Sequence, residues 1–293
     1  MTIVLFGGNG QIGWELQPAL GFLGSLTTLG RAEVDMEHPD RLRAAVRTHS
    51  PNVIINAAAY TMVDAAEADE PRAWRVNADA PGVLAEEARR LGALLVHYST
   101  DYVFDGEARS PYEESAPPRP LGAYGRSKLA GELRVRESGA RAVVLRTAWI
   151  YASRGKNFYL TIRRLAKERE SLRVVADQRG APTWARSVAQ ATGTLLARLF
   201  DPGVAERIFA ESPSRLYHMT CGGETTWFGF AQAILADLER PHARLEPIST
   251  NEYPTPARRP RYSVLSNARL AEDFGIRLPH WQEAFTAMNG QMP

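Results

Sequence analysis

The stretch Thr2–Gly13, TIVLFGGNGQIG, decides the fold class of this chain. A short apolar run, Thr2–Phe6, ends in glycines, and a helical spacing of apolar residues follows over Gln11–Leu20. Glycine permits a tight turn and lets the backbone approach a phosphate, while a helix N-terminus offers free N–H groups. We therefore expect a strand, a phosphate-binding turn and a helix, with the turn built on Gly7, Gly10 and Gly13.

The glycine spacing G-x-x-G-x-x-G is weak evidence for a ligand site on its own, because glycine turns without a ligand are common. Its place after the first strand and before the first helix favours dinucleotide binding. Further strand-like segments follow at Leu26–Leu29, Val53–Ala58, Leu94–Tyr98 and Ala142–Ile150. They alternate with helix-like segments at Arg41–Arg47, Pro71–Leu91 and Tyr124–Ser138. This alternation predicts an α/β fold, a Rossmann-type doubly wound parallel sheet.

The regular alternation weakens after about residue 151. Helices are expected at Phe158–Glu168, Ala185–Leu199 and Trp227–Leu238, with a short strand at Leu216–Met219 and a proline-rich loop at Tyr253–Pro260. We expect residues 1–150 to form the dinucleotide-binding domain. Residues 151–293 should form mainly a smaller substrate-binding lid, with helix 185–199 packing back on the first domain.

Composition excludes several classes of protein. The chain has 293 residues and a net charge of only +2, so neither nucleic acid nor an anionic membrane is an expected partner. The single cysteine, Cys221, allows no disulfide framework and no cysteine-based metal site. With no signal peptide and no apolar run long enough to span a bilayer, a cytoplasmic location is expected.

Three polar side chains are expected to meet at one edge of the sheet. Strand Leu94–Tyr98 runs into Ser99-Thr100-Asp101, and Tyr124 and Lys128 stand four residues apart on one helix face. Reduction of a ketone leaves an alkoxide that needs a proton, which a tyrosine phenol can donate. We expect Lys128 to lower the pKa of Tyr124 and to reach the cofactor's ribose, and the Thr100 hydroxyl to hold the ketone oxygen.

The motif Y-x-x-x-K alone is weak evidence for catalysis, since it also describes two exposed residues on one helix face. The evidence is stronger here because the glycine turn and Thr100 precede the motif in the chain. The chain has only three lysines, so Lys128 at this place is informative. The second strand ends in Gly30-Arg31 without an acid, which favours NADPH over NADH because Arg31 can bind a 2′-phosphate. Alternatively, Asp35 folds back to the ribose and NADH is used equally well.

The chain resembles the extended short-chain dehydrogenase/reductase superfamily and, within it, the dTDP-4-dehydrorhamnose reductase family. The similarity runs nearly end to end, over LFGGNGQIGWELQ, VIINAAAYTMVDAAE, VHYSTDYVFDG, YGRSKLAGE, LRTAWIYA, DQRGAPT and YPTPARRP. It implies an NADPH-dependent reductase of the C4 ketone of a dTDP-sugar, with NADH possible as cofactor.

The resemblance also implies roles for individual residues. Tyr124 would be the proton donor and Lys128 its partner, while Thr100, Asp101 and Trp149 would meet the sugar. The cofactor would lie along Gly10, Gln11, Ile12, Ala57, Ala58, Ala59, Tyr60 and Thr61. Some members of the family form magnesium-linked homodimers, and Glu15 matches one of the acidic positions, so Mg²⁺ and a homodimer are further expectations.

Other interpretations of these residues stay open. Trp149 could be core packing, and Asp101 could cap a loop. Asp64 and Glu67 are interpreted as a solvated helix start. Arg259, in PTPARRP, is equally consistent with surface charge and with binding the substrate diphosphate.

Two rival functions remain. A nucleotide-sugar dehydratase or epimerase is one, although related dehydratases carry Asp-Glu after the threonine, where this chain has Asp101-Tyr102. The other is a non-catalytic regulatory subunit of the same fold, which the presence of Thr100, Tyr124 and Lys128 argues against.

Overall fold

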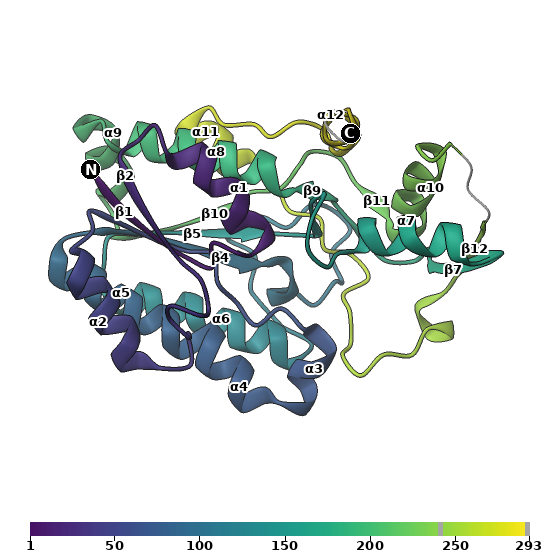
Figure 1. The fold of residues 1–293 in the computed structure, drawn as a ribbon, viewed down its shortest axis with the longest axis horizontal. Helices are drawn as coiled ribbons and strands as arrows, with labels where there is room; N and C mark the ends of the chain where they lie inside the picture. Colours follow the sequence, from purple (N-terminus) through teal and green to yellow (C-terminus); the bar gives the residue numbers. More distant parts are fainter. Residues whose placement is uncertain (240–242, 291–293) are drawn as a thin grey trace.

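The computed structural model describes residues 1–239 and 243–290. Its centre is a six-stranded sheet in the order β10-β5-β4-β3-β1-β2, in which every neighbouring pair is parallel. The chain winds from β1 outward to β2, then crosses to β3 and continues in the opposite direction (Figure 1). The Rossmann-type doubly wound sheet is therefore confirmed. Its strands are β1 (Thr2–Phe6), β2 (Ser25–Leu29), β3 (Val53–Asn56), β4 (Leu94–Thr100), β5 (Ala142–Thr147) and β10 (Ser214–His218).

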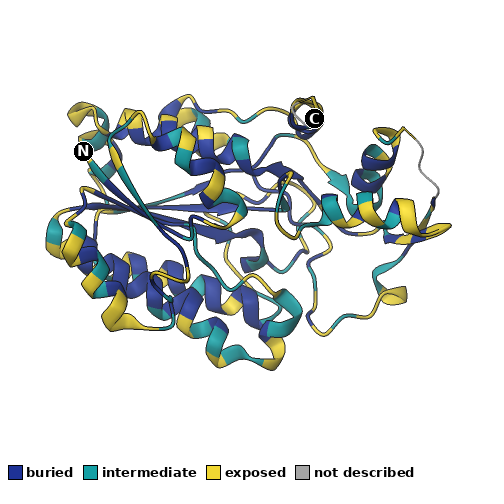
Figure 2. Ribbon diagram, in the orientation of Figure 1, coloured by how far each residue is buried: buried dark blue, intermediate teal, exposed yellow. Residues whose placement is uncertain are grey.

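Helices cover both faces of this sheet (Figure 1). Alternate residues of a strand point to opposite faces, so Ile3 and Leu5 pack in one cluster while Val4 and Phe6 pack in another. The first face is covered by α1 (Gln11–Leu20) and α8 (Ala185–Leu199), and the second by α2 (Pro39–His49), α5 (Ala80–Leu91) and α6 (Ala123–Glu137). The strands are thus buried from both sides (Figure 2).

A third hydrophobic cluster lies at the other end of the molecule, around Tyr159, Phe230 and Trp281. There β12 pairs in parallel with β7. The elements that supply this cluster are α7 (Phe158–Glu168), α10 (Trp227–Ala236), α12 (Trp281–Asn289), β7 (Ser171–Val175) and β12 (Arg244–Ile248). The remaining elements are α3 (Val63–Ala68), α4 (Glu70–Trp74), η2 (Asp101–Val103), β8 (Arg179–Gly180), β9 (Thr183–Trp184), α9 (Pro202–Phe209), β11 (Thr225–Thr226), η3 (Thr250–Glu252) and α11 (Ala268–Phe274).

Two expected elements are broken in the structure. The expected helix Pro71–Leu91 consists of α4, a π-helical stretch η1 (Arg75–Asp79) and α5. Pro81 has no N–H to donate to a carbonyl four residues earlier, so the regular helical ladder cannot run through this point. The expected strand Ala142–Ile150 stops at Thr147, because Trp149 adopts a left-handed φ of 48°. The chain then continues as β6 (Ile150–Tyr151), which pairs with β9 instead.

No helix among the described residues is long and apolar enough to cross a membrane.

Candidate active site

The glycine turn joins β1 to α1 as expected. Gly7 has a φ of 83°, and a Cβ atom there would stand 2.5 Å from the Ala58 backbone nitrogen, so only glycine fits. Gly10 N donates to Gly7 O at 2.9 Å, which closes the turn. A side chain at Gly13 would collide with the same carbonyl, so this glycine lets α1 approach the turn. Gly7, Gly10 and Gln11 thereby reach the wall of a cavity at the N-terminus of α1.

A cavity of about 730 Å³ opens at the carboxyl ends of the strands, where the winding direction reverses between β1 and β3. Open α/β sheets bind ligands at this position. Most residues expected to bind cofactor or substrate line this one cavity; Gly13, Glu15 and Arg259 lie outside its wall. The expected residues in the wall are Gly7, Gly10, Gln11, Ile12, Arg31, Asp35, Ala57, Ala58, Ala59, Tyr60, Thr61, Thr100, Asp101, Tyr124, Lys128 and Trp149.

Thr100, Tyr124 and Lys128 come together on the cavity wall. Thr100 ends β4, where its Oγ1 accepts a hydrogen bond from Tyr102 N at 3.2 Å and donates to Asp101 at 3.1 Å. Tyr124 and Lys128 lie in the first half of α6, and both are buried. Lys128 Nζ donates to the Tyr98 carbonyl at 2.6 Å, which holds the ammonium group at the end of β4.

The expectation that Lys128 lowers the pKa of Tyr124 is wrong for this conformation. Burial raises the pKa of Tyr124 to about 12, against the opposing effect of its hydrogen bond with Thr100. Burial also lowers the pKa of Lys128 to about 8, which the nearby Glu132 carboxylate opposes. Loss of hydration therefore outweighs the opposing hydrogen bond at Tyr124 and the opposing carboxylate charge at Lys128. Tyr124 is a protonated phenol at neutral pH, the form that can donate a proton.

Behind Lys128 lies a buried ion pair. Glu132, one helical turn further along α6, accepts hydrogen bonds from Arg146 Nη2 at 2.6 Å and Nε at 2.9 Å. Ser99 Oγ donates to the same carboxylate at 2.5 Å. The carboxylate thus connects α6, β5 and the end of β4 beneath the three polar residues.

Two tryptophans stack on each other in the wall of the cavity. The rings of Trp149 and Trp227 are parallel within 4°, with centroids 3.5 Å apart. A Cβ atom at Gly180 would collide with the Trp149 indole, so this ring is enclosed between Gly180 and Trp227. Trp149 therefore lines the pocket, as the resemblance implies, and it also packs against a second aromatic ring. Trp227 was not expected from the sequence.

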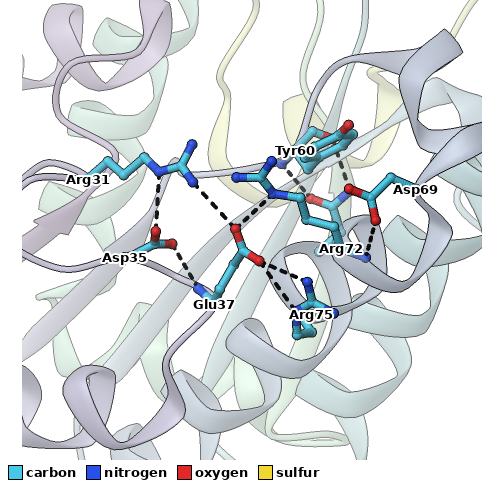
Figure 3. A network of polar contacts seen from close by, with 8 residues as sticks. Arg31, Asp35, Glu37, Tyr60, Asp69, Arg72 and Arg75 are labelled. Atoms are coloured by element: carbon cyan, nitrogen blue, oxygen red, sulfur yellow. Dashed lines mark hydrogen bonds and ion pairs between the residues drawn. The ribbon is translucent and has the colours of Figure 1, made fainter.

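At the opposite end of the cavity, Arg31 is surrounded by acids (Figure 3). Arg31 Nε donates to Asp35 at 3.3 Å, and its Nη2 donates to Glu37 at 3.4 Å. Asp35 and Glu37 both line the cavity. The idea that no carboxylate stands near the end of the second strand is thus wrong, because the chain after β2 turns back and brings both acids beside Arg31.

Glu15, matched to a magnesium ligand, instead accepts a hydrogen bond from Arg186 Nε at 2.7 Å. In residues 1–239 and 243–290 no group of three or more His, Cys, Asp or Glu side chains could hold a metal ion. A guanidinium group supplies the positive charge that balances this buried carboxylate.

Asp64 lies in the first turn of α3 and Glu67 is exposed, as expected for a solvated helix start, but both carboxylates also have partners. Asp64 Oδ2 accepts from Arg259 Nη2 at 2.7 Å, so Arg259 lies against α3. Glu67 accepts from Ala123 N at 2.7 Å and caps the N-terminus of α6. Each carboxylate therefore connects α3 to a distant part of the chain.

Several cavity residues could not be expected from local patterns. Glu37, Arg72 and Trp227 lie in separate elements without a shared spacing. Asn157 offered a signal, since Asn directly before the helix 158–168 is a typical N-cap. Its Oδ1 accepts from Leu160 N at 2.9 Å and its Nδ2 donates to Gln11 Oε1 at 2.8 Å, which ties α7 to the glycine turn.

A doubly wound sheet, a glycine turn at its switch point and a Thr–Tyr–Lys group in the same cavity define a dinucleotide-binding oxidoreductase of the short-chain dehydrogenase/reductase class. The family model for the RmlD substrate binding domain matches residues 1–292. The chain belongs to this family, and relatives similar to it over nearly its whole length include dTDP-4-dehydrorhamnose reductases.

Among these relatives, the dTDP-4-dehydrorhamnose reductase of Burkholderia thailandensis is 52% identical over 97% of this chain and 96% of its own length. That of Escherichia coli K12 is 40% identical over 100% and 98%. A solved dTDP-4-dehydrorhamnose reductase from Clostridium acetobutylicum has a TM-score of 0.90 and 34% identity, with both chains covered completely. One from Bacillus anthracis, in complex with NADP, has a TM-score of 0.89 and 32% identity over 99% of each chain.

Proposed function

We propose that this protein reduces the C4 ketone of dTDP-4-dehydro-L-rhamnose to dTDP-L-rhamnose, the last step of dTDP-rhamnose biosynthesis, with NADPH as the cofactor. The observation that carries this proposal is the meeting of Thr100, Tyr124 and Lys128 in one cavity with the glycine turn. The full-length similarity to dTDP-4-dehydrorhamnose reductases supports the same substrate.

The glycine turn suits a dinucleotide, because Gly7 and Gly10 line the cavity at the N-terminus of α1, where free N–H groups can meet a pyrophosphate. Residues around Gly10–Ile12 would border the pyrophosphate, and Ala57–Thr61 would lie along the adenosine half. We infer that residues 1–150 hold the cofactor and that residues 151–293 mainly hold the sugar nucleotide. NADPH supplies the reducing equivalent when bound.

The residues of the chain would then complete the reduction. The Thr100 hydroxyl orients the ketone oxygen, and the Tyr124 phenol donates its proton to that oxygen as negative charge develops there. The Lys128 ammonium group, held by the Tyr98 carbonyl, would reach the ribose of the cofactor. The Trp149–Trp227 wall would pack against the apolar side of the sugar, and Asp101 would bind one of its hydroxyls.

The direct test is oxidation of NADPH in the presence of dTDP-4-keto-6-deoxy-L-mannose, measured beside the corresponding GDP- and UDP-sugars. We expect turnover with the dTDP-sugar and no dehydration of dTDP-glucose. Formation of a 4-keto-6-deoxyglucose product would instead identify a dehydratase.

Tyr124→Phe is the matched variant for this reaction. It keeps the ring and removes the donated proton, so turnover should fall by roughly two to four orders of magnitude, as for loss of a general acid. The affinity for NADPH, measured by fluorescence titration, should barely change. Normal turnover by the Phe variant would exclude Tyr124 as the proton donor.

The homodimer implied by the resemblance remains a prediction, which light scattering on the purified protein tests. The cytoplasmic location likewise remains a prediction.

A further inference from the structure

Two arginines from different elements line the same end of the cavity. Arg31 follows β2, and Arg72 belongs to α4 beyond β3; Glu37 lies between them (Figure 3). Arg72 Nε donates to Glu37 Oε1 at 2.8 Å, and Arg31 Nη2 donates to the same oxygen at 3.4 Å. The two guanidinium groups thus converge on a single oxygen atom. A second anion placed beside that atom would be within reach of both.

Arg72 is the more firmly held of the two arginines. Its backbone N–H donates to the Asp69 side chain at 3.3 Å, which caps α4, and its guanidinium group lies over the Tyr60 ring at 5.8 Å. The Arg72 side chain is 32% exposed, against 68% for Arg31. A side chain that is already fixed loses less conformational entropy when it binds a ligand. Arg72 should therefore contribute more to binding than the more exposed Arg31.

Glu37 is shared by three arginines. Arg75 Nη2 donates to the other carboxylate oxygen at 3.0 Å. Although burial opposes it, hydrogen bonds from Arg75 and Arg72 keep the pKa of Glu37 below its usual value, so the group is charged at neutral pH. One carboxylate cannot satisfy three guanidinium groups, which have five N–H donors each. Donors on Arg31 and Arg72 remain to bind a further anion, but Glu37 competes for them.

We propose that Arg72, together with Arg31, binds the 2′-phosphate of NADPH, and that Glu37 is the resident anion that limits the preference for NADPH over NADH. The proposal rests on NADPH being the cofactor of the proposed reaction. A phosphate presents several oxygens to two planar guanidinium forks, a geometry that gives strong charge-assisted hydrogen bonds. NADH, with a ribose hydroxyl at this place, gains little from either arginine.

The test compares two ligands that differ only in the 2′-phosphate: adenosine 2′,5′-bisphosphate and adenosine 5′-monophosphate. Calorimetric titration gives the ratio of their dissociation constants for the full-length protein. Arg72→Gln should reduce the advantage of the bisphosphate by about tenfold or more, the value of one charge-assisted hydrogen bond. Glu37→Gln should increase that advantage, because it removes the competing negative charge and keeps the side chain's shape.

Arg75→Gln is the matched control, since Arg75 binds the same carboxylate but lies outside the cavity wall. It should leave the ratio nearly unchanged. An unchanged ratio in Arg72→Gln, a ratio that fails to rise in Glu37→Gln, or an equal loss in Arg75→Gln would each overturn the proposal. Thermal melting of each variant checks that it is folded.

The titration uses no keto-sugar, so it separates this inference from the proposed reaction. If the wild-type protein does not prefer the bisphosphate, the inference is wrong whatever the turnover assay gives. If it prefers the bisphosphate and the variants behave as expected, the inference stands even if no dTDP-sugar is reduced.

Discussion

Asp101 places a carboxyl group where it is almost completely removed from water. The residue is 2% exposed, and burial raises its pKa to about 6, against hydrogen bonds that include one from Ser263 and one from Thr100. Within the described chain its Oδ2 atom has no hydrogen-bond partner. Such a group destabilises the folded protein when it is charged, and it is available to a polar ligand in the cavity.

Asp101→Asn should therefore stabilise the protein at neutral pH and weaken substrate binding. The folded-state pKa of about 6 lies above the ordinary value of 3.8. The wild-type protein should lose stability as the pH rises through that interval, and the Asn variant should not. The difference above pH 6 is roughly 1–3 kcal/mol, from the relation between pKa shift and free energy. Urea unfolding at pH 4 and pH 7.5 measures it, and equal losses in both proteins would contradict the assignment.

Glu132 acts on Lys128 through its charge. The carboxylate opposes the effect of burial on the pKa of Lys128, so Glu132→Gln should lower that pKa further below about 8. The ammonium group would then lose its proton at a lower pH, and kcat/KM for the keto-sugar should begin to fall at a lower pH than in the wild type.

Ser99→Ala provides the control, because it removes a hydrogen bond to the same carboxylate and keeps its charge. If the fall of kcat/KM at high pH moved equally in both variants, the shift would come from altered packing and not from the charge of Glu132. Loss of the Glu132 charge leaves Arg146 without its buried partner, so melting curves are needed to check that each variant is still folded.

At the scale of elements, α6 depends on α3 for its N-terminus. Gly122 stands at the N-cap without a side chain, and Glu67 supplies the carboxylate that accepts from Ala123 N. Asp or Glu at this end also interacts favourably with the helix dipole. The capped residue directly precedes Tyr124, so the cap fixes the start of the helix that carries the phenol.

Glu67→Ala should lower the free energy of unfolding by about 1 kcal/mol, as for other lost caps. It should also reduce kcat more than it changes the dissociation constant for NADPH, because the position of Tyr124 becomes less defined. Glu67→Gln keeps an acceptor oxygen and should restore most of the activity. Full kcat in the Ala variant, with the expected loss of stability, would limit Glu67 to a structural role.

At the scale of the whole molecule, the stacked tryptophans connect the two halves of the chain. Trp149 follows β5 of the central sheet, and Trp227 begins α10 in the third hydrophobic cluster, where Phe158 also packs on it at 4.6 Å. The cavity wall that would meet the sugar thus depends on how these two halves pack together.

Trp227→Ala should raise the KM for the keto-sugar by up to about tenfold, since loss of an aromatic contact costs about 0.5–1.5 kcal/mol. The affinity for NADPH should change little, because the proposed cofactor site lies at the glycine turn. The coupled near-ultraviolet circular dichroism of the indole pair should disappear. Trp227→Phe, which keeps a stacked ring, is the control; an unchanged KM in the Ala variant would exclude the wall from substrate binding.

Local features could be predicted from the sequence. The bounds of β1, α1, α7 and α8 agree with the apolar periodicity, because the hydrogen bonds of one helix or strand impose that period on neighbouring residues. The glycine turn and the helical spacing of Tyr124 and Lys128 are also local, so the sequence by itself determined the class of fold and the main polar groups of the site.

Only the tertiary structure decided which side chains from distant parts of the chain contact one another in and around the site. Glu37 beside Arg72, Glu67 on the end of α6 and Trp227 on Trp149 join residues that are at least 30 positions apart. Their meeting depends on the strand order β2-β1-β3 and on the packing of α10 against α7 and β7, which no local period encodes. The raised pKa of Tyr124 also depends on the tertiary structure, because the phenol loses its hydration only when the whole cavity is formed.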